Sequence, residues 1–430
     1  MKNKEILLYA QETLLKAGAQ KTKCSLTKKE KKELNVASGK ISLFRTTFDT
    51  NMSLTAIVDD KKGTISLNKL DKENIDATAK QIIDMAISSK PDEANDIAEM
   101  QPAKEFHKEP IKPDLDKMYD RLVEFMDFAK KEHPKTIIEE INFDFTSTES
   151  YFVNSNGVDY KTTKGIYSFV VMFTSKDGKK TSSFNYAAHV SKSLDTPFSK
   201  CGNIDKLLGE SSEQLDTKHI HEKFVGDVII TPECLDSFVG SLTNYLYDYS
   251  LITNTSVFKD KLGKQIASTS FNLHSKPVSS DIAASYYITG DGYEAQDSTV
   301  IEDGILNTFL LGLYGAKKTG KDRAVNQGGC WEIASGDTAL EEIIKSTKKG
   351  IVLKRFSGGN PSDNGDFSGV AKNSYYVEDG EIQFPITETM VSGNLVEMMM
   401  NIKQISEERI NSGYHNYPWI KFDGLTVSGK

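Results

Sequence analysis

A block of strand-like segments joined by turn-forming residues most constrains what this chain can fold into. The segments have the apolar and β-branched content of strands, and they occupy residues 136–145, 150–153, 166–174 and 181–189. Two stretches between them, Asn154-Ser155-Asn156-Gly157 and Lys176-Asp177-Gly178-Lys179, are typical of hairpin turns. The block therefore predicts an antiparallel sheet in the first half of the chain.

Helical periodicity flanks this block. Apolar residues recur at helical spacing in three places, near residues 4–17, 75–86 and 115–129. Shorter strand-like runs lie between the first two helices, at residues 39–44, 54–58 and 64–67. Four prolines mark the stretch from 91 to 113 as a connector.

The second half opens with a buried-looking strand at 225–230, followed by a helix that begins at Pro232. Short strands and glycine turns follow, with one further helix that a capping box from Thr338 to Glu341 would start. The segment 191–223 is polar, so we expect little core to hold it. The sequence predicts an α+β fold, with a mixed N-terminal α/β region and a β-rich C-terminal domain, divided at 1–110, 111–222 and 223–430.

The charge balance argues against nucleic acid as a partner. Lysine plus arginine is 53 and aspartate plus glutamate is 61, which gives a net charge of −8. Glu30 and Glu33 interrupt the one local basic cluster, Lys28, Lys29, Lys31 and Lys32. A solvated turn is the preferred interpretation of that cluster, with a binding patch as the alternative.

Neither a membrane span nor a disulfide framework is predicted. No run of about 18 apolar residues occurs, as a spanning helix requires. The four cysteines, Cys24, Cys201, Cys234 and Cys330, form no CxxC pair. We therefore expect reduced thiols and a cytoplasmic location.

Several motifs allow both a chemical and a plain structural interpretation. His219 and His221 would point the same way on a strand, as metal ligands can, but no third ligand lies at a familiar spacing, which favours a surface linker. Cys330 lies beside two glycines and could be a nucleophile, yet no histidine partner is evident, which favours a buried, inert thiol. The acidic stretch 289–294 is either a turn or an ion site, and the turn is preferred.

The glycine-dense stretch 358–369 lacks the spacing of a phosphate-binding loop. Its second part is a candidate for lining a peptide channel, because glycine allows close backbone approach. The residues concerned are Asn364, Gly365, Asp366, Phe367, Ser368 and Gly369.

The order of motifs in the second half resembles the TldD/PmbA family, a metalloprotease family also called modulators of DNA gyrase. The similar pieces are VIITPE at 228–233, LGKQIA at 262–267, VIEDGIL at 300–306, GDFS at 365–368, YVEDGEI at 376–382, VSGNL at 391–395 and LTVSG at 425–429. The first half fits more loosely, through Asn154-Ser155-Asn156-Gly157 and the early helix–strand–helix order. No single piece is specific, but their order covers nearly the whole chain.

The resemblance also implies where zinc would bind in a catalytic member. TldD-type subunits carry HExxxH on the helix after the strand at 225–230 and a cysteine ligand near the C-terminus, whereas PmbA/TldE-type subunits lack the motif. In this chain the motif positions fall near Gly240, Ser241 and Tyr245, none of which can replace its counterpart. The stretch 412–417 contains no cysteine. The resemblance thus implies no bound metal or other cofactor and no catalytic residue.

We accordingly expect a PmbA/TldE-like, zinc-free subunit of a TldD/TldE-type system that acts on peptides. Its partner would be a TldD-type catalytic subunit or a second copy of itself. The alternative is a homodimeric peptide-binding or structural protein without protease activity. The resemblance leaves open whether the chain has any catalysis of its own.

Overall fold

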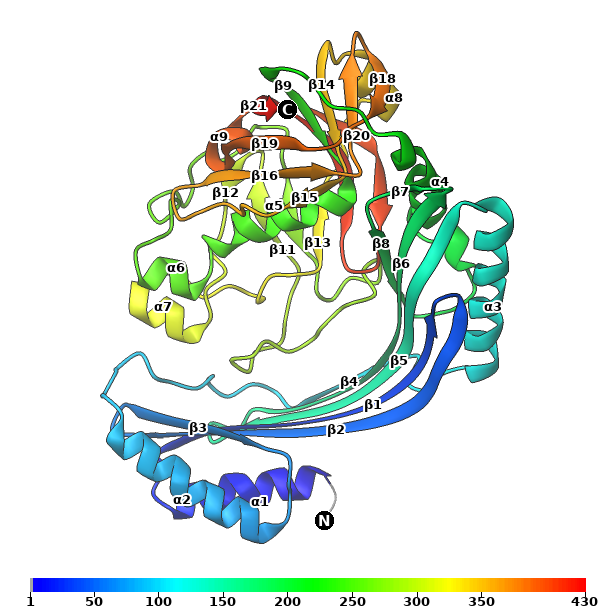
Figure 1. The fold of residues 1–430 in the computed structure, drawn as a ribbon. Coiled ribbons are helices and arrows are strands. Elements are labelled where there is room, and N and C mark those ends of the chain that lie inside the picture. Colours follow the sequence, from blue (N-terminus) through cyan, green and yellow to red (C-terminus); the bar gives the residue numbers. More distant parts are fainter. Residues whose placement is uncertain (1–2) are drawn as a thin grey trace.

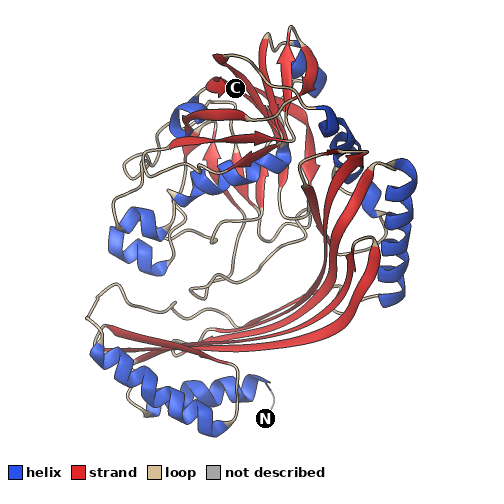
Figure 2. Ribbon diagram, viewed as in Figure 1, coloured by secondary structure: helices blue, strands red, loops and turns tan. Residues whose placement is uncertain are grey.

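The structure, a computed structural model, describes residues 3–430 and contains one long, curved N-terminal sheet and a β-rich C-terminal part (Figures 1 and 2). The sheet has the strand order β3-β2-β1-β5-β6-β4, and β7 and β8 also pair with β6. Its strands are β1 (Lys21–Ala37), β2 (Lys40–Val58), β3 (Lys61–Leu67), β4 (Lys104–Lys108), β5 (Thr136–Asn154), β6 (Asp159–Asp177), β7 (Lys180–Thr181) and β8 (Asn185–Ser191). The segments 1–110 and 111–222 therefore contribute strands to one sheet, and the domain boundaries stay predictions.

Helices cover the outer, convex side of this sheet (Figure 1). They are α1 (Asn3–Lys16) and α2 (Lys72–Ser88) at one end, and α3 (Leu115–Glu132) at the other. The predicted inward faces are largely confirmed, since all five apolar positions proposed for α2 are buried. Ala17 and Leu115 are the exceptions, because each lies at a helix end and stays exposed.

The C-terminal part lies on the concave side of the sheet (Figure 1). Its main strand path is β12-β11-β10-β13-β21-β9-β14-β17-β18, and β15, β16, β19 and β20 join through β21. The strands are β9 (Lys223–Ile230), β10 (Leu273–Ser275), β11 (Ser298–Glu302), β12 (Ile305–Leu306), β13 (Trp331–Ile333), β14 (Lys349–Leu353), β15 (Arg355–Ser357), β16 (Asp366–Lys372), β17 (Tyr375–Glu378), β18 (Glu381–Pro385), β19 (Thr389–Asn394), β20 (Ile402–Asn411) and β21 (Asn416–Ser428). The α+β class, with its β-rich second half, is confirmed.

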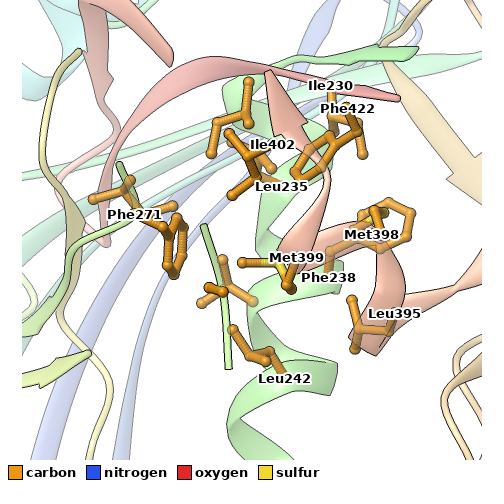
Figure 3. Close-up of a cluster of buried hydrophobic side chains, with 14 of the residues drawn as sticks. Ile230, Leu235, Phe238, Leu242, Phe271, Leu395, Met398, Met399, Ile402 and Phe422 are labelled. Carbon is orange, nitrogen blue, oxygen red and sulfur yellow. The ribbon is translucent and has the colours of Figure 1, made fainter. Parts of the chain in front are cut away.

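The core of the C-terminal part packs around one helix. The helices here are α5 (Pro232–Asn244), α6 (Asp248–Ile252), α7 (Leu313–Thr319), α8 (Leu340–Lys345) and α9 (Leu395–Met400). Figure 3 shows Leu235, Phe238 and Leu242 of α5 facing the apolar side chains of α9 and β21. Since α5 follows β9 directly, its position is fixed by a strand in the middle of the sheet.

The sequence predicted a solvated turn for the basic cluster, and this prediction is wrong. The cluster is part of β1. Lys28, Lys29, Lys31 and Lys32 are all paired in register with both β2 and β5. Lys31 lies 3.1 Å from Glu33 and 3.4 Å from Asp144. Charges that look like a solvated turn in the sequence are thus matched along and across strands.

The polar segment 191–223 is also better held than predicted. It forms a short 3-10 turn, η1 (Phe198–Lys200), the helix α4 (Ile204–Glu213) and a second turn, η2 (Gln214–Asp216). Leu207 and Leu208 of α4 are buried in the cluster that also contains α3. The weak sequence signal arises because only one side of a short helix is apolar.

The predicted capping box at the start of α8 is wrong. The helix begins at Leu340, and no side chain of the preceding residue caps it. The Leu340 N–H instead donates to the carboxylate of Glu408, at 2.9 and 3.1 Å. A residue of β20 therefore supplies the acceptor that the sequence assigned to Thr338.

Candidate functional site

The three positions of the zinc motif lie in the second half of α5 and its C-terminal end. Gly240 is half-buried, and a side chain built there would meet no atom within 4 Å. The Ser241 hydroxyl donates to the carbonyl oxygen of Ser237 at 2.9 Å. The Tyr245 hydroxyl donates to the Ser362 carbonyl oxygen at 2.5 Å, and burial raises its pKa. One position therefore has no ligand atom, and both hydroxyls are already used.

The predicted channel loop begins close to Tyr245. Its first two residues, Asn364 and Gly365, belong to a turn that starts at Ser362, whose carbonyl oxygen accepts from the Gly365 N–H at 2.8 Å. From Asp366 onward the chain is strand β16, paired with β19. The structure thus brings this segment to the end of α5, as a turn and a strand rather than one loop.

The side chains of β16 divide between core and surface. Phe367 is buried against Phe238 of α5, with ring centroids 5.4 Å apart. Gly369 faces the backbone at Gly358, whereas Ser368 is exposed. None of the residues 364–369 lines either of the two cavities described next, and their role in a peptide channel stays a prediction.

A cavity of about 540 Å³, here called the sheet cavity, lies between the concave face of the sheet and the C-terminal part. Its walls come from β1, β5 and β6 on one side and from residues 286–291, Leu313 and Tyr314 on the other. Burial lowers the pKa of both Lys23 and Lys164, which reach into this space. Lys164 donates to the Ser285 carbonyl oxygen, and Lys23 donates to that of Gly290 at 3.3 Å.

A second cavity of about 760 Å³, here called the helix cavity, lies at the start of α5. Its walls come from β8, α4, the first turns of α5, and residues 284–286, 327–331 and 410–415. Tyr286 lines both cavities. The two cavities therefore share one wall residue.

Cys330 lies in the wall of the helix cavity, but its surroundings favour the inert interpretation. Burial raises the pKa of its thiol to about 11, and its sulfur donates to the Ala284 carbonyl oxygen at 3.5 Å. The charged groups that act on it are Lys164, Asp297 and Lys192, with no imidazole among them. A thiol without a thiolate-stabilising base is a poor nucleophile.

The segment 412–417, where the resemblance places the late cysteine ligand, does reach α5. It does so at the first turns of the helix rather than at Gly240. Nε2 of His415 lies 3.9 Å from the Asp236 carboxylate, and its ring stacks on Tyr417 with centroids 4.1 Å apart. Glu233 and Asp236 of α5 line the same cavity as His415.

Sequence reasoning missed this cluster of Glu233, Asp236, His415 and Tyr417. The acids are about 180 residues away from the aromatic pair, and no local spacing connects them. The one available signal was the pair of carboxylates at i and i+3 in the first turn and a half of a helix. That pattern is common on solvated helices, so it has little predictive value.

The described residues do not fit a zinc ion. Between residues 3 and 430, no group of three or more His, Cys, Asp or Glu side chains is placed to hold a metal. His219 and His221 have ring centroids 6.1 Å apart, and the nearest acid to His219 is Glu388, at 3.7 Å. Zinc needs at least three converging protein ligands.

The acidic stretch 289–294 is a turn that joins the two parts of the molecule. The Thr289 N–H donates to the Tyr293 carbonyl oxygen at 2.8 Å, which closes the turn. The Tyr293 hydroxyl then donates to Glu99 at 2.5 Å, and Glu294 pairs with Lys104 of β4. The turn interpretation is therefore right, and Tyr293 and Glu294 of the turn bind residues of the N-terminal region.

Comparison with known proteins places these features in a family context. A sequence model of the "PmbA/TldA metallopeptidase C-terminal domain" matches residues 224–429, and one of the "PmbA/TldA metallopeptidase domain 1" matches residues 25–86. The metalloprotease PmbA of Escherichia coli O157:H7 is 30% identical over 184 residues. These residues are 42% of this chain and 41% of that protein, so the alignment covers less than half of the relative.

Two solved structures share the whole fold. A candidate modulator of DNA gyrase from Bacteroides thetaiotaomicron matches with a TM-score of 0.87 at 22% identity, over 100% of this chain and 99% of its own. TldE from Thermococcus kodakarensis matches with a TM-score of 0.81 at 18% identity, over 99% of each chain. Within residues 3–430, no helix is long and apolar enough to cross a membrane.

Proposed function

Because this chain belongs to the PmbA/TldD metallopeptidase family, we propose that it is a zinc-free subunit of a TldD/TldE-type peptidase system. In this proposal a TldD-type chain supplies zinc and hydrolyses the peptide bond. The present chain completes the assembly and helps to hold the peptide. The proposal includes a cytoplasmic location, which the four free, buried cysteines support.

The observation that carries this proposal is the state of the three motif positions. Gly240 offers no ligand atom, and the hydroxyls of Ser241 and Tyr245 donate to backbone carbonyl oxygens. Zinc-assisted hydrolysis needs a metal to polarise the carbonyl and a base to activate water. This end of α5 offers neither, so we derive no step through zinc in this chain.

The fold around these positions is nevertheless intact. The helix that would carry the motif packs on β21 and α9 through Leu235, Phe238 and Leu242. A chain that keeps this scaffold without the metal ligands is best explained by a role in assembly or peptide positioning. The sheet cavity and the helix cavity offer space for parts of such a peptide.

Peptidase assays with three samples test the proposal: this chain alone, a TldD-type chain alone, and the two together. Cleavage of an unfolded peptide is expected only, or far more strongly, in the mixture. A TldD-type chain whose motif glutamate is replaced by glutamine is the matched control, since it keeps the interface. Cleavage by this chain alone that survives chelation and requires Cys330 or His221 would refute the zinc-free subunit.

A second candidate is a homodimeric peptide-binding protein without a protease partner. It is favoured by the volumes of the two cavities, about 540 and 760 Å³, which leave room for parts of a peptide. The native mass separates the two candidates. A stable homodimer that binds peptides but does not bind TldD-type chains would support the peptide-binding homodimer and contradict the zinc-free subunit.

A further inference from the structure

Buried polar atoms without hydrogen-bond partners gather at the start of α5. In the described part of the chain such side-chain atoms occur on eight residues. Four of these lie here, namely Thr231, Glu233, His415 and Tyr417. Unpartnered buried polar groups are rare in folded proteins because each loses its hydration without replacement. Two of the four, Glu233 and His415, line the helix cavity, where a bound ligand would complete them.

Glu233 is the most telling of the four. Both of its carboxylate oxygens are buried, and neither has a hydrogen-bond partner. It lies in the first turn of α5, where the helix dipole favours a negative charge. The dipole offsets only part of the cost of burying a carboxylate, so a positively charged partner is needed to complete the site.

The neighbouring groups are acceptors for such a partner. Asp236, one turn further along α5, lines the same cavity. Burial lowers the pKa of His415 despite the nearby carboxylates, and its Nδ1 has no hydrogen-bond partner. Tyr417 is fully buried behind the cavity wall, where burial and the neighbouring Asp236 carboxylate raise the pKa of its hydroxyl. A donor with several N–H groups would satisfy these acceptors together.

The rest of the cavity wall suits an organic cation. The residues that line it include no lysine or arginine. Its aromatic side chains are Tyr186, Tyr247, Tyr286, Trp331 and Tyr414. Aromatic faces attract ammonium and guanidinium groups and also pack against alkyl chains. A bare metal ion is a poor fit, because no three ligands converge among residues 3–430.

We propose that the helix cavity binds a primary ammonium or guanidinium group on an apolar stem, with Glu233 and Asp236 as its counter-charges. A lysine or arginine side chain of an extended peptide, or the amino terminus of a peptide, has this chemistry. The volume of about 760 Å³ accommodates such a group together with neighbouring peptide atoms. Both proposed counter-charges are residues of this chain, so the inference is tested without a peptidase partner.

Calorimetric titration of the full chain with four small peptides tests the site. The probes are acetyl-alanyl-lysyl-alanine amide, its arginine counterpart, the neutral norleucine counterpart, and the norleucine peptide with a free amino terminus. The charged peptides should bind at least about tenfold more tightly than the neutral one. Comparison of the lysine, arginine and free-amine probes identifies the source of the cation. Equal affinity of all four would overturn the proposal.

Variants then assign the binding to the acids. Glu233→Gln and Asp236→Asn should each weaken the best charged probe at least about tenfold, and norleucine binding should not change. Glu73→Gln is the matched control, since Glu73 is exposed in the first turn of α2. An unchanged affinity of Glu233→Gln for the charged probe would contradict the proposal. Stoichiometric zinc binding by the wild type that is lost in Glu233→Gln would also contradict it.

Urea unfolding of Glu233→Gln shows whether weaker binding results from the lost charge or from a loss of folded structure. Glu233→Gln removes a buried charge that has no partner, so the variant should unfold at the same or a higher urea concentration than the wild type. A strongly destabilised Glu233→Gln variant would show that the carboxylate has an internal partner, which also overturns the proposal. Fluorescence of Trp331 in the cavity wall gives a second binding signal.

Discussion

The curved N-terminal sheet and the C-terminal part reach a stable β structure in different ways. The four central strands of the sheet, β1, β2, β5 and β6, are 17–19 residues long and pair antiparallel with one another, and only the short β4 joins in parallel, at β6. The C-terminal part instead joins many short strands, two of its pairings are parallel, and α5 lies in its core. In a long hairpin most paired residues lie close in the sequence. The short strands instead depend on contacts between residues far apart in the sequence, made across the whole domain.

The two parts also differ in how their cores are packed. The sheet has an aromatic cluster beneath α3, in which Phe169 stacks on Phe198 with ring centroids 3.9 Å apart. The C-terminal core surrounds α5 with a mixture of aliphatic, methionine and phenylalanine side chains (Figure 3). Between them, the turn at 289–294 and the contacts of Asp96 hold the two parts together. Substitutions in the sheet, in the C-terminal core and at the contacts between them should therefore change stability in distinguishable ways.

The largest effect is expected from Phe169→Ala. The side chain is 1% exposed and contacts the rings of Phe125, Phe143 and Phe198. Its removal should destabilise the sheet by about 3–5 kcal/mol, through lost burial and a cavity. Urea denaturation measures this loss. Phe48→Ala, at a position 75% exposed on β2, is the control and should change stability by less than about 0.5 kcal/mol.

A smaller effect is expected from Gly292→Ala. It should be confined to the joint, which is the contact between the turn at 289–294 and the N-terminal sheet. Gly292 has φ +98°, and a Cβ there would overlap the ring of Phe152 on β5. Backbone strain and overpacking should weaken the joint by about 2–4 kcal/mol, seen as faster proteolysis near 289–294. Gly290→Ala is the control, since its Cβ would meet only the Gln327 side chain at 3.6 Å. Equal effects at both positions would contradict the packing argument.

An electrostatic contribution to the contact between the two parts is expected from Asp96. Burial alone would raise its pKa, but hydrogen bonds from Lys21 and Lys317 outweigh it and lower the pKa to about 2. Since the pKa is depressed in the folded state, the pairing stabilises the protein fully above about pH 4 and is lost as the pH falls through about 2. Asp96→Asn should cost about 2 kcal/mol at pH 7.

The pH dependence provides the check on this prediction. The difference in unfolding free energy between the wild type and Asp96→Asn should shrink as the pH falls from about 4 to about 2. A difference that stays constant over this range would show that Asp96 contributes through packing rather than charge.

The smallest effect, and a stabilising one, is expected from Gly240→Ala. Gly240 lies inside α5 with open space around its Cα, so alanine should raise stability by about 0.5–1 kcal/mol through helix propensity. Thermal unfolding measures the gain. Gly315→Ala in α7 is the contrasting control, because a Cβ there would overlap the Asp248 carboxylate. Destabilisation by Gly240→Ala would mean that this position does contact a ligand or a neighbour.

The sequence predicted features whose causes are local. The buried face of α2, the hairpin turn at Asn154–Gly157 and the start of α5 at Pro232 were all found from spacing and turn chemistry. In that turn the Asn154 side chain accepts from the N–H groups of Asn156 and Val158 at 3.0 Å each. Such interactions span a few residues, so the sequence contains them directly.

Features that depend on a neighbouring strand were missed. The charged residues of β1 form a strand because β2 and β5 pair with both of its edges. Likewise α4 is held by an apolar cluster contributed by α3 and the sheet. Propensity alone favours turns and loose segments at both places, and tertiary packing overrides it.

For the candidate site, the sequence by itself determined that Gly240, Ser241 and Tyr245 cannot form the family's zinc site, because ligand chemistry depends on residue type alone. Only the tertiary structure brought Glu233 and Asp236 of α5 to His415 and Tyr417, and left the Glu233 carboxylate and Nδ1 of His415 unpartnered beside a cavity. The physical reason is that the antiparallel pairing of β9 with β21 places the start of α5 beside the start of β21. That register connects segments about 180 residues apart, and no local pattern specifies it.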